Sequence, residues 1–313
     1  MSIGDSNINS PSQVSPPNSG ASDSVSESSS PNNGKKYTPD QVAGMKRRAE
    51  AEPLSDKKPK RIRPTLSLKL PDSSTKPSDP QVENLKALII EHKSNTKSDP
   101  IKKGQHVLYP ITGNGVKLYA HKLPRSEQEV CSLWSLARSE GVSKIVCLQR
   151  PGLVSPYVPE EIKLGEKITC TDGTTVKISE IPAKNKADFK SFTVQVTPAN
   201  GDTSEPRTVH VDQVLNWNDD EAVPLEQAKS LVDNLPIENC QIHCEGGLGR
   251  TGALIVMKQL KMDKELTKAN MMNRIAGLVA DGRVQRERNE FVKTDVQLRL
   301  LIDFAGDLIK DQK

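Results

Sequence analysis

The chain has 313 residues, of which 34% are hydrophobic and 3% aromatic, and its formal net charge at pH 7 is +4. That length allows one large domain or two small ones, and the low aromatic content indicates a long polar segment beside them. A net charge this small does not by itself indicate nucleic acid as a partner. The sequence contains no N-terminal apolar export stretch and no apolar run of 18 residues, so it predicts neither a cleaved signal peptide nor a membrane span.

Residues 1–79 are predicted to form a disordered tail, because serine makes up twelve of the first thirty residues and aliphatic residues are few. Two basic clusters, Lys46–Arg48 and Lys57–Arg61, resemble a bipartite nuclear-import signal, although solvated linker charge is the interpretation that we favour. The alternating segment Leu66–Leu70 is typical of a strand that adds to a partner's sheet, for example that of a secretion chaperone. A chance amphipathic patch explains it equally well.

The globular part is predicted to comprise residues 80–313. Apolar residues at helical spacing predict an opening helix behind the start signal Ser78-Asp79. A second helix is predicted to begin at the capping-box pair Ser126 and Glu129.

A mixed sheet is predicted to follow these helices. Lys144–Leu148 has the composition of a buried strand, and its place after a helix indicates a parallel component. From about 165 to 215 the hydrophobic period is two, and Asp172-Gly173 and Asn200-Gly201 mark hairpin turns. The fold class is therefore α/β (α+β), with a mixed central sheet flanked by helices. Later helices are predicted at about 225–235, 253–261, 263–281 and 294–310.

The five cysteines form no CxxC pair and no even disulfide framework, which favours a reducing compartment at the place of action. They are Cys131, Cys147, Cys170, Cys240 and Cys244. Cys240 and Cys244 are four residues apart on a predicted strand, so their Cα atoms would be ~13 Å apart, which is too far for a disulfide. Cys240 is therefore expected in the core.

The most informative segment joins a strand-like run to an apolar helical run. It reads His243-Cys244-Glu245-Gly246-Gly247-Leu248-Gly249-Arg250-Thr251-Gly252. The backbone N–H groups of such a loop can all point inward, and the following helix directs its positive dipole end to the same place, which suits a phosphate dianion. The three loop glycines permit positive φ angles, and the fork of Arg250 matches two phosphate oxygens. The same field favours the thiolate form of Cys244, which is the nucleophile.

This pattern, His-Cys followed by five residues and Arg-Thr-Gly, resembles the signature loop of the cysteine-dependent protein tyrosine phosphatases. A glycine-rich turn around a structural cysteine is the alternative, but it would need no inward arginine. The resemblance covers about residues 105–310 and implies hydrolysis of phosphotyrosine without a metal or other cofactor, since Arg250 and the loop supply the positive charge. It further implies that Cys244 attacks, that Thr251 stabilises the leaving thiolate and that His243 orders the loop from behind. Residues implied to bind the phosphate are Glu245, Gly246, Gly247, Leu248, Gly249 and Arg250.

Asn216–Pro224 resembles the mobile Trp-Pro-Asp loop of the same family, with Asn218 where proline is usual. The resemblance makes Trp217 the anchor of this acid loop and Asp219 the general acid. Such an acid is needed because a tyrosine phenolate, with a conjugate-acid pKa of about 10, leaves poorly unless it is protonated. The neighbouring carboxylates Asp220 and Glu221 are alternatives for this role.

The segment from Arg283 to Leu298 resembles the family's C-terminal Arg-x-x-Arg and glutamine-loop region. Lys293 occupies the first glutamine position of that motif, and Gln297 the second. Gln297 is implied to bind substrate and position water, although an exposed helix residue is an equally good interpretation. The aromatic residue that sets pocket depth is Tyr109 or Tyr119, and the sequence does not choose between them.

Within the family, the chain most resembles the SptP/YopH-type phosphatases that pathogens inject by type III secretion. The resemblance implies a monomer that leaves the cell by a type III-like route, with a chaperone on its tail, and acts on host phosphoproteins in the host cytoplasm. Two alternatives remain for the loop itself. An inositol phosphate or lipid phosphatase would favour lysines where this loop has Glu245, and a pseudophosphatase would bind phosphotyrosine without turnover.

Overall fold

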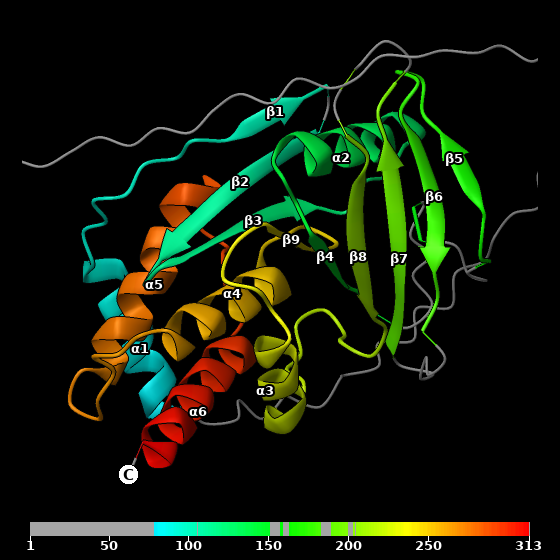
Figure 1. Cartoon of the computed structure of the whole chain (residues 1–313). Coiled ribbons are helices and arrows are strands. Elements are labelled where there is room, and N and C mark those ends of the chain that lie inside the picture. The colour runs from blue at the N-terminus through cyan, green and yellow to red at the C-terminus, as the bar shows by residue number, and fades with distance from the viewer. Residues whose placement is uncertain are drawn as a thin grey trace, which may run out of the picture. The chain divides into compact units, whose positions relative to one another are not determined.

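A nine-stranded mixed sheet organises the described part of the chain, and helices lie against both of its faces (Figure 1). The computed structural model describes residues 78–104, 106–150, 157–158, 163–182, 189–199, 203 and 205–312. The predicted tail, apart from Ser78 and Asp79, lies outside these residues together with its basic clusters and Leu66–Leu70. The Asn200-Gly201 turn lies outside them as well.

The spatial order of the strands is β1-β2-β3-β9-β4-β8-β7-β6-β5. Strands β3, β9, β4 and β8 run parallel to one another, and the strands on either side pair antiparallel. The strand bounds are β1 Ile101–Lys103, β2 His106–Gly113, β3 Val116–Lys122, β4 Lys144–Leu148, β5 Lys167–Thr169, β6 Thr175–Glu180, β7 Phe189–Thr197, β8 Arg207–Val214 and β9 Cys240–Cys244. The predicted mixed sheet, its buried strand β4 and the hairpin at Asp172-Gly173 are thus confirmed.

The antiparallel strands β1 to β3 are an addition that the sequence analysis did not predict. Within the register, β3 aligns Lys122 with Cys244 of β9. The end of β3 therefore lies beside the strand end that carries the cysteine.

Two of the predicted helix starts are confirmed at the level of hydrogen bonds. The carboxylate of Asp79 accepts a hydrogen bond from Gln81 N at 2.9 Å at the start of α1, and Ser126 Oγ accepts one from Glu129 N at 3.2 Å at the start of α2. The Glu129 carboxylate does not complete the capping box. It binds Lys122 Nζ and Arg125 N instead, both at 2.6 Å. The helix bounds are α1 Pro80–Glu91, α2 Glu127–Ser139, α3 Leu225–Asp233, α4 Gly249–Lys261, α5 Met271–Arg286 and α6 Asp295–Asp311.

The predicted helix at 263–281 is wrong in both its bounds, since α5 runs from Met271 to Arg286. Asp263 Oδ1 accepts a hydrogen bond from Glu265 N, and Asn270 Oδ1 accepts one from Thr267 N. Such local bonds from side chain to backbone compete with helix formation, so the chain turns before α5 begins. The Arg-x-x-Arg motif consequently lies in the last turn of α5 rather than after it.

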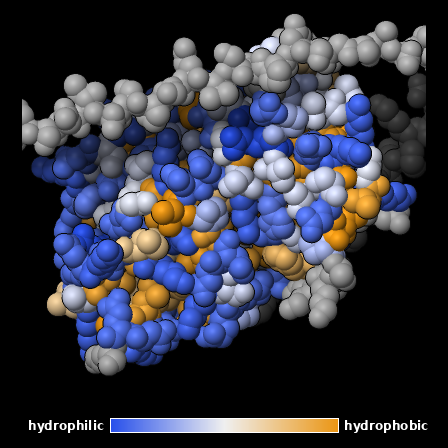
Figure 2. Space-filling model, in the orientation of Figure 1, coloured by the Kyte–Doolittle hydropathy of each residue, from blue (hydrophilic) through white to orange (hydrophobic). Residues whose placement is uncertain are grey.

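Hydrophobic residues pack in two layers, one on each face of the sheet. One layer joins the sheet to α1, α3, α4, α5 and α6. The other joins α2 to residues of β2, β3, β4, β6, β7 and β8. On the face of the molecule seen in Figure 2, hydrophilic residues cover most of the surface and hydrophobic ones appear as separate groups. No helix in the described part of the chain is long and apolar enough to cross a membrane.

Candidate active site

The signature loop connects the end of β9 to the start of α4, at the carboxyl ends of the parallel strands. Cys244 is the last residue of β9 and is 3% exposed, whereas Arg250, in the first turn of α4, is fully buried. Because α4 begins at Gly249, its unpaired N–H groups and positive dipole end face the loop. The predicted strand-loop-helix arrangement is present, with the helix starting four residues earlier than expected.

Of the three loop glycines that permit a positive φ, only Gly247 adopts one. Gly247 has φ +69°, and a Cβ there would lie 1.9 Å from His121 O. A Cβ at Gly249 would lie 2.8 Å from Gln297 Nε2, so the end of that buried side chain would have to shift. A Cβ at Gly246 would meet nothing closer than 3.8 Å. The loop therefore depends on glycine most strictly at 247, where both φ and a backbone oxygen exclude a side chain.

Arg250 joins the signature loop to the acid loop. Its Nη1 donates a hydrogen bond to Trp217 O at 2.7 Å, and its Nη2 lies 3.3 Å from Asp219 Oδ1. Within the described residues, Nε and Nη2 of Arg250 are buried and donate no hydrogen bond. Buried guanidinium donors rarely stay without an acceptor, so Nε, and Nη2 beside the Asp219 carboxylate, are the donors that an anion held in the loop would engage.

The acid loop separates its three carboxylates. Trp217 is fully buried and donates from Nε1 to Glu221 O at 3.1 Å. The Glu221 carboxylate accepts from Asn218 Nδ2 at 2.8 Å, and that of Asp220 lies 3.4 Å from Lys293 Nζ. Asp219 is half-exposed and lies beside Arg250. The geometry therefore favours Asp219 over its two neighbours as the group facing the signature loop.

His243 lies directly behind the loop, as the resemblance implies. Its Nδ1 is 3.2 Å from Cys244 O, and its Nε2 contacts the hydroxyl of Tyr157. Burial lowers the pKa of His243 to about 3, so the ring is neutral. A neutral ring that donates from Nδ1 to the carbonyl accepts at Nε2 from the Tyr157 hydroxyl. Tyr157 is a supporting residue that the sequence analysis missed, because no local pattern connects it to a loop 86 residues later.

Arg286 fastens the signature loop from the side of α5. Its Nε and Nη2 donate to Gly247 O and Gly246 O, both at 3.3 Å, and its guanidinium lies 3.9 Å from the centre of the Tyr109 ring. Tyr109, Glu245, Gly246 and Leu248 are among the residues that line a groove of about 550 Å³.

Of the two candidate aromatic residues, Tyr109 is the one at this site. Tyr119 is buried with α2 in the hydrophobic layer on the other face of the sheet.

The carboxylate of Glu245, the residue after the cysteine, points to a basic neighbour. Its Oε1 lies 3.2 Å from Arg125 Nη2, and its backbone oxygen accepts from Leu123 N at 3.1 Å. Arg125 comes from the segment between β3 and α2 and is a second neighbour of the loop that the sequence analysis did not identify.

Thr251 belongs to the first turn of α4, and Gln297 of α6 packs against Gly249 at the start of that turn. Thr251 Oγ1 is buried and has no hydrogen-bond partner within the described residues, so its hydroxyl is free to donate. Gln297 is fully buried, so the interpretation of an exposed helix residue is wrong. Its Oε1 accepts from Lys293 N at 3.0 Å and Thr294 N at 3.4 Å, and it forms the capping box of α6 with Thr294.

The five cysteines are free and buried. Burial raises the pKa of Cys240 to about 12, which fits the predicted core position. Within the described residues no group of three or more His, Cys, Asp or Glu side chains has the arrangement of a metal site.

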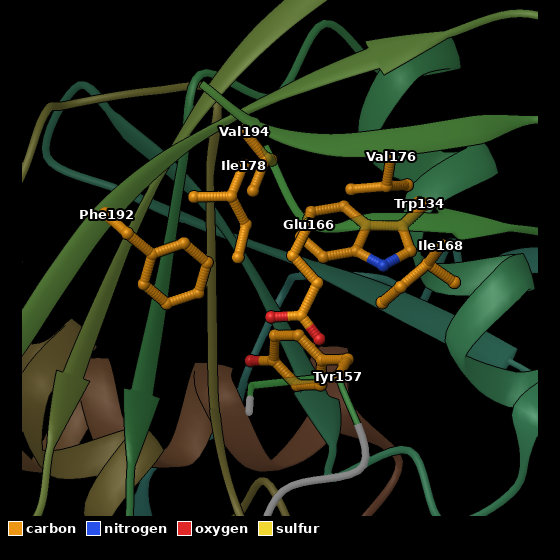
Figure 3. Close-up of a pocket in the computed structure, with 8 residues that line it drawn as sticks. All are labelled: Trp134, Tyr157, Glu166, Ile168, Val176, Ile178, Phe192 and Val194. Atoms are coloured by element: carbon orange, nitrogen blue, oxygen red, sulfur yellow. The ribbon is translucent and has the colours of Figure 1, made fainter. Parts of the chain in front are cut away.

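A second cavity, of about 110 Å³, lies on the α2 side of the sheet (Figure 3). Its lining side chains are Trp134, Tyr157, Glu166, Ile168, Val176, Ile178, Phe192 and Val194. The lining is mainly apolar, with Glu166 as its one charged side chain, and contains no cysteine and no cation. This lining offers no group that resembles the cysteine and arginine of the signature loop.

Comparison with known proteins agrees with this geometry. The family model of the protein-tyrosine phosphatases matches residues 111–306. No curated protein sequence matches the chain significantly. Among solved structures, the fold is similar to that of the Trypanosoma brucei tyrosine phosphatase TbPTP1, with a TM-score of 0.55, 15% identity and coverage of 74% of this chain and 92% of that chain.

The Trypanosoma cruzi phosphatase TcPTP1 gives a TM-score of 0.53 at 14% identity, covering 73% of this chain and 94% of that one. A structure of PTPN18, which concerns distinct HER2 tyrosine phosphorylation sites, gives a TM-score of 0.50 at 19% identity, covering 62% of this chain and 69% of that one. Identities this low show the fold alone. Since the family model covers more than half of the sequence and the signature loop is complete, the chain belongs to the protein-tyrosine phosphatase family.

Proposed function

We propose that this protein hydrolyses phosphotyrosine in protein substrates through a cysteinyl-phosphate intermediate. The observation that carries the proposal is the meeting of three groups at one loop. Cys244 ends β9, Nε and Nη2 of Arg250 are buried and donate no hydrogen bond within the described residues, and Asp219 Oδ1 lies 3.3 Å from that Nη2. A nucleophile, a fork for phosphate oxygens and a carboxylic acid are the groups that this reaction requires.

In the first step Cys244 Sγ forms a bond to phosphorus while the bond from phosphorus to the tyrosine oxygen breaks. The loop N–H groups and Arg250 stabilise the charge on the equatorial oxygens, and Asp219 transfers its proton to the departing phenolate. In the second step Asp219 takes a proton from water, the water oxygen bonds to phosphorus and the S–P bond breaks. The hydroxyl of Thr251 donates to the released thiolate.

Two features favour a phosphoprotein substrate over an inositol phosphate. Glu245 occupies a loop position where an inositol phosphate phosphatase would favour a lysine, and its side chain is 33% exposed in its ion pair with Arg125. The solved PTPN18 structure of similar fold concerns tyrosine phosphorylation sites of a protein. The presence of cysteine, arginine and aspartate together favours turnover over capture without hydrolysis.

The Asp219→Ala variant tests the proposed function directly through its general acid. In Asp219→Ala the leaving oxygen receives no proton, so kcat for a phosphotyrosine peptide should fall by about 10²–10⁴-fold. For an aryl phosphate whose phenolate leaves easily, such as 4-nitrophenyl phosphate, the fall should be much smaller. An equal decrease with both substrates would contradict the assignment of Asp219 as the acid.

We further propose, from the sequence alone, that the protein is a type III-secreted effector of the SptP/YopH type that acts as a monomer on host phosphoproteins. The support is the serine-rich tail of residues 1–79, together with the Gly246-Gly247 pair, the Asn216-Trp217 entry to the acid loop and the run Arg283-Val284-Gln285-Arg286. Fusion of residues 1–79 to a reporter enzyme tests this proposal, since type III-dependent export of the reporter is expected. Export that does not depend on the tail would contradict it.

A further inference from the structure

The acid loop of this protein is tied to the start of α6 by an ion pair that involves the lysine at the family's first glutamine position. Lys293 Nζ lies 3.4 Å from Asp220 Oδ1. The two residues are 73 positions apart in the sequence, and each side chain is a little more than half exposed. Asp220 follows the proposed acid directly, so whatever restrains Asp220 also restrains Asp219.

The backbone of Lys293 is held in place by hydrogen bonds at the start of α6. Its backbone N–H donates to Gln297 Oε1 at 3.0 Å, and the next residue, Thr294, caps α6. Gln297 is fully buried against Gly249 of the signature loop. The ammonium group therefore extends from a segment whose position is coupled to the signature loop.

The tip of the acid loop has few other attachments. Asp220 has φ +61°, a left-handed conformation that costs an aspartate some conformational energy. Within the described residues, Asp219 and Asp220 are held to the rest of the protein by ion pairs, with Arg250 and Lys293 respectively, and no backbone hydrogen bond of either residue holds them. Loss of one ion pair should therefore change the fraction of time for which Asp219 lies at the signature loop.

We propose that Lys293 is a positioning residue for the phosphatase reaction, because its ion pair with Asp220 holds the acid loop in the arrangement that places Asp219 at the signature loop. This inference rests on the proposed function. Lys293 Nζ pairs with Asp220 rather than with Asp219, so it acts on the acid through Asp220. An exposed ion pair shifts such an equilibrium only modestly, so the effect is about two- to fivefold in the population of the closed loop.

The test compares kcat and KM of the full chain with its Lys293→Gln and Asp220→Asn variants and the double variant. For a phosphotyrosine peptide, each single variant should lower kcat by about two- to fivefold, and the double variant by no more than either. For 4-nitrophenyl phosphate the fall should be smaller, because that leaving group needs little help from the acid. Lys293→Arg should restore kcat, and about 1 M NaCl should lower the wild-type kcat toward that of Lys293→Gln.

A matched control is Lys229→Gln, since Lys229 forms a partly exposed ion pair with Asp307 at 2.6 Å between α3 and α6. That variant should keep the wild-type kcat. Unchanged kcat in both single variants, or a double variant whose loss is the product of the two single losses, would overturn the inference while leaving the phosphatase function intact. If the wild type releases phosphate from neither substrate, the proposed function fails, and the inference fails with it.

Discussion

Replacing Gly247 by alanine should inactivate the signature loop, while the same change at Gly246 should be tolerated. Gly247 has φ +69°, which costs an L-residue about 1–2 kcal/mol. The larger effect is steric, because the new Cβ would lie 1.9 Å from His121 O. The loop or β3 must move by more than about 1 Å to remove this overlap, and a displacement of that size at reacting groups costs about 10²-fold in rate.

The assay is kcat/KM for a phosphotyrosine peptide, with thermal unfolding measured in parallel. Gly247→Ala should lose about 10²-fold or more in kcat/KM. Gly246→Ala, whose Cβ would meet nothing closer than 3.8 Å, should retain activity within about threefold.

A variant at Gly115 measures the cost of a positive φ without steric overlap. It has φ +74° but no atom within 4 Å of a new Cβ, so Gly115→Ala should cost about 1–2 kcal/mol of stability and little activity. Full activity in Gly247→Ala, or equal damage in Gly246→Ala, would refute the described loop geometry.

Two more predictions concern groups around the loop. Arg286→Lys loses the fork that binds Gly246 O and Gly247 O, so kcat/KM should fall by at least about tenfold; an active Lys variant would contradict this support role. The second concerns pH, since burial lowers the pKa of His106 from 6.5 to about 4. Below pH 6.5 the unfolded chain therefore binds a proton that the native ring does not, and the native state loses stability, by about 3 kcal/mol once the pH is below 4. In urea unfolding His106→Phe should lose less stability between pH 7 and 4 than wild type, and parallel losses would contradict this.

The signature loop could be located from the sequence because its functional groups are contiguous, from Cys244 to Arg250. The capping box of Thr294 and Gln297 was also present as a local pattern, and it would have predicted that Gln297 turns back toward the chain rather than outward. The outcome for the loop glycines shows the limit of this reasoning. A glycine that adopts a positive φ and one that does not look alike until the neighbouring strand and helix are placed.

Other features depend on contacts between distant segments. Strand β3 lies between β2 and β9, and its residues Leu118–His121 are buried on both faces of the sheet. Val116–Lys122 therefore lacks the alternation that identifies a half-exposed strand. Tyr157, Arg125 and Arg286 support the loop through side-chain contacts across 86, 120 and 39 or 40 positions. No periodicity along the chain reports such contacts, and only the folded arrangement brings them together.

The central claim is that Cys244 is the nucleophile of a phosphatase. Phosphate release from a phosphotyrosine peptide by the full chain, compared with its Cys244→Ser variant, tests it most directly. A serine hydroxyl in place of the thiolate should abolish release while leaving peptide binding intact. Equal rates of release by the two proteins would contradict the account.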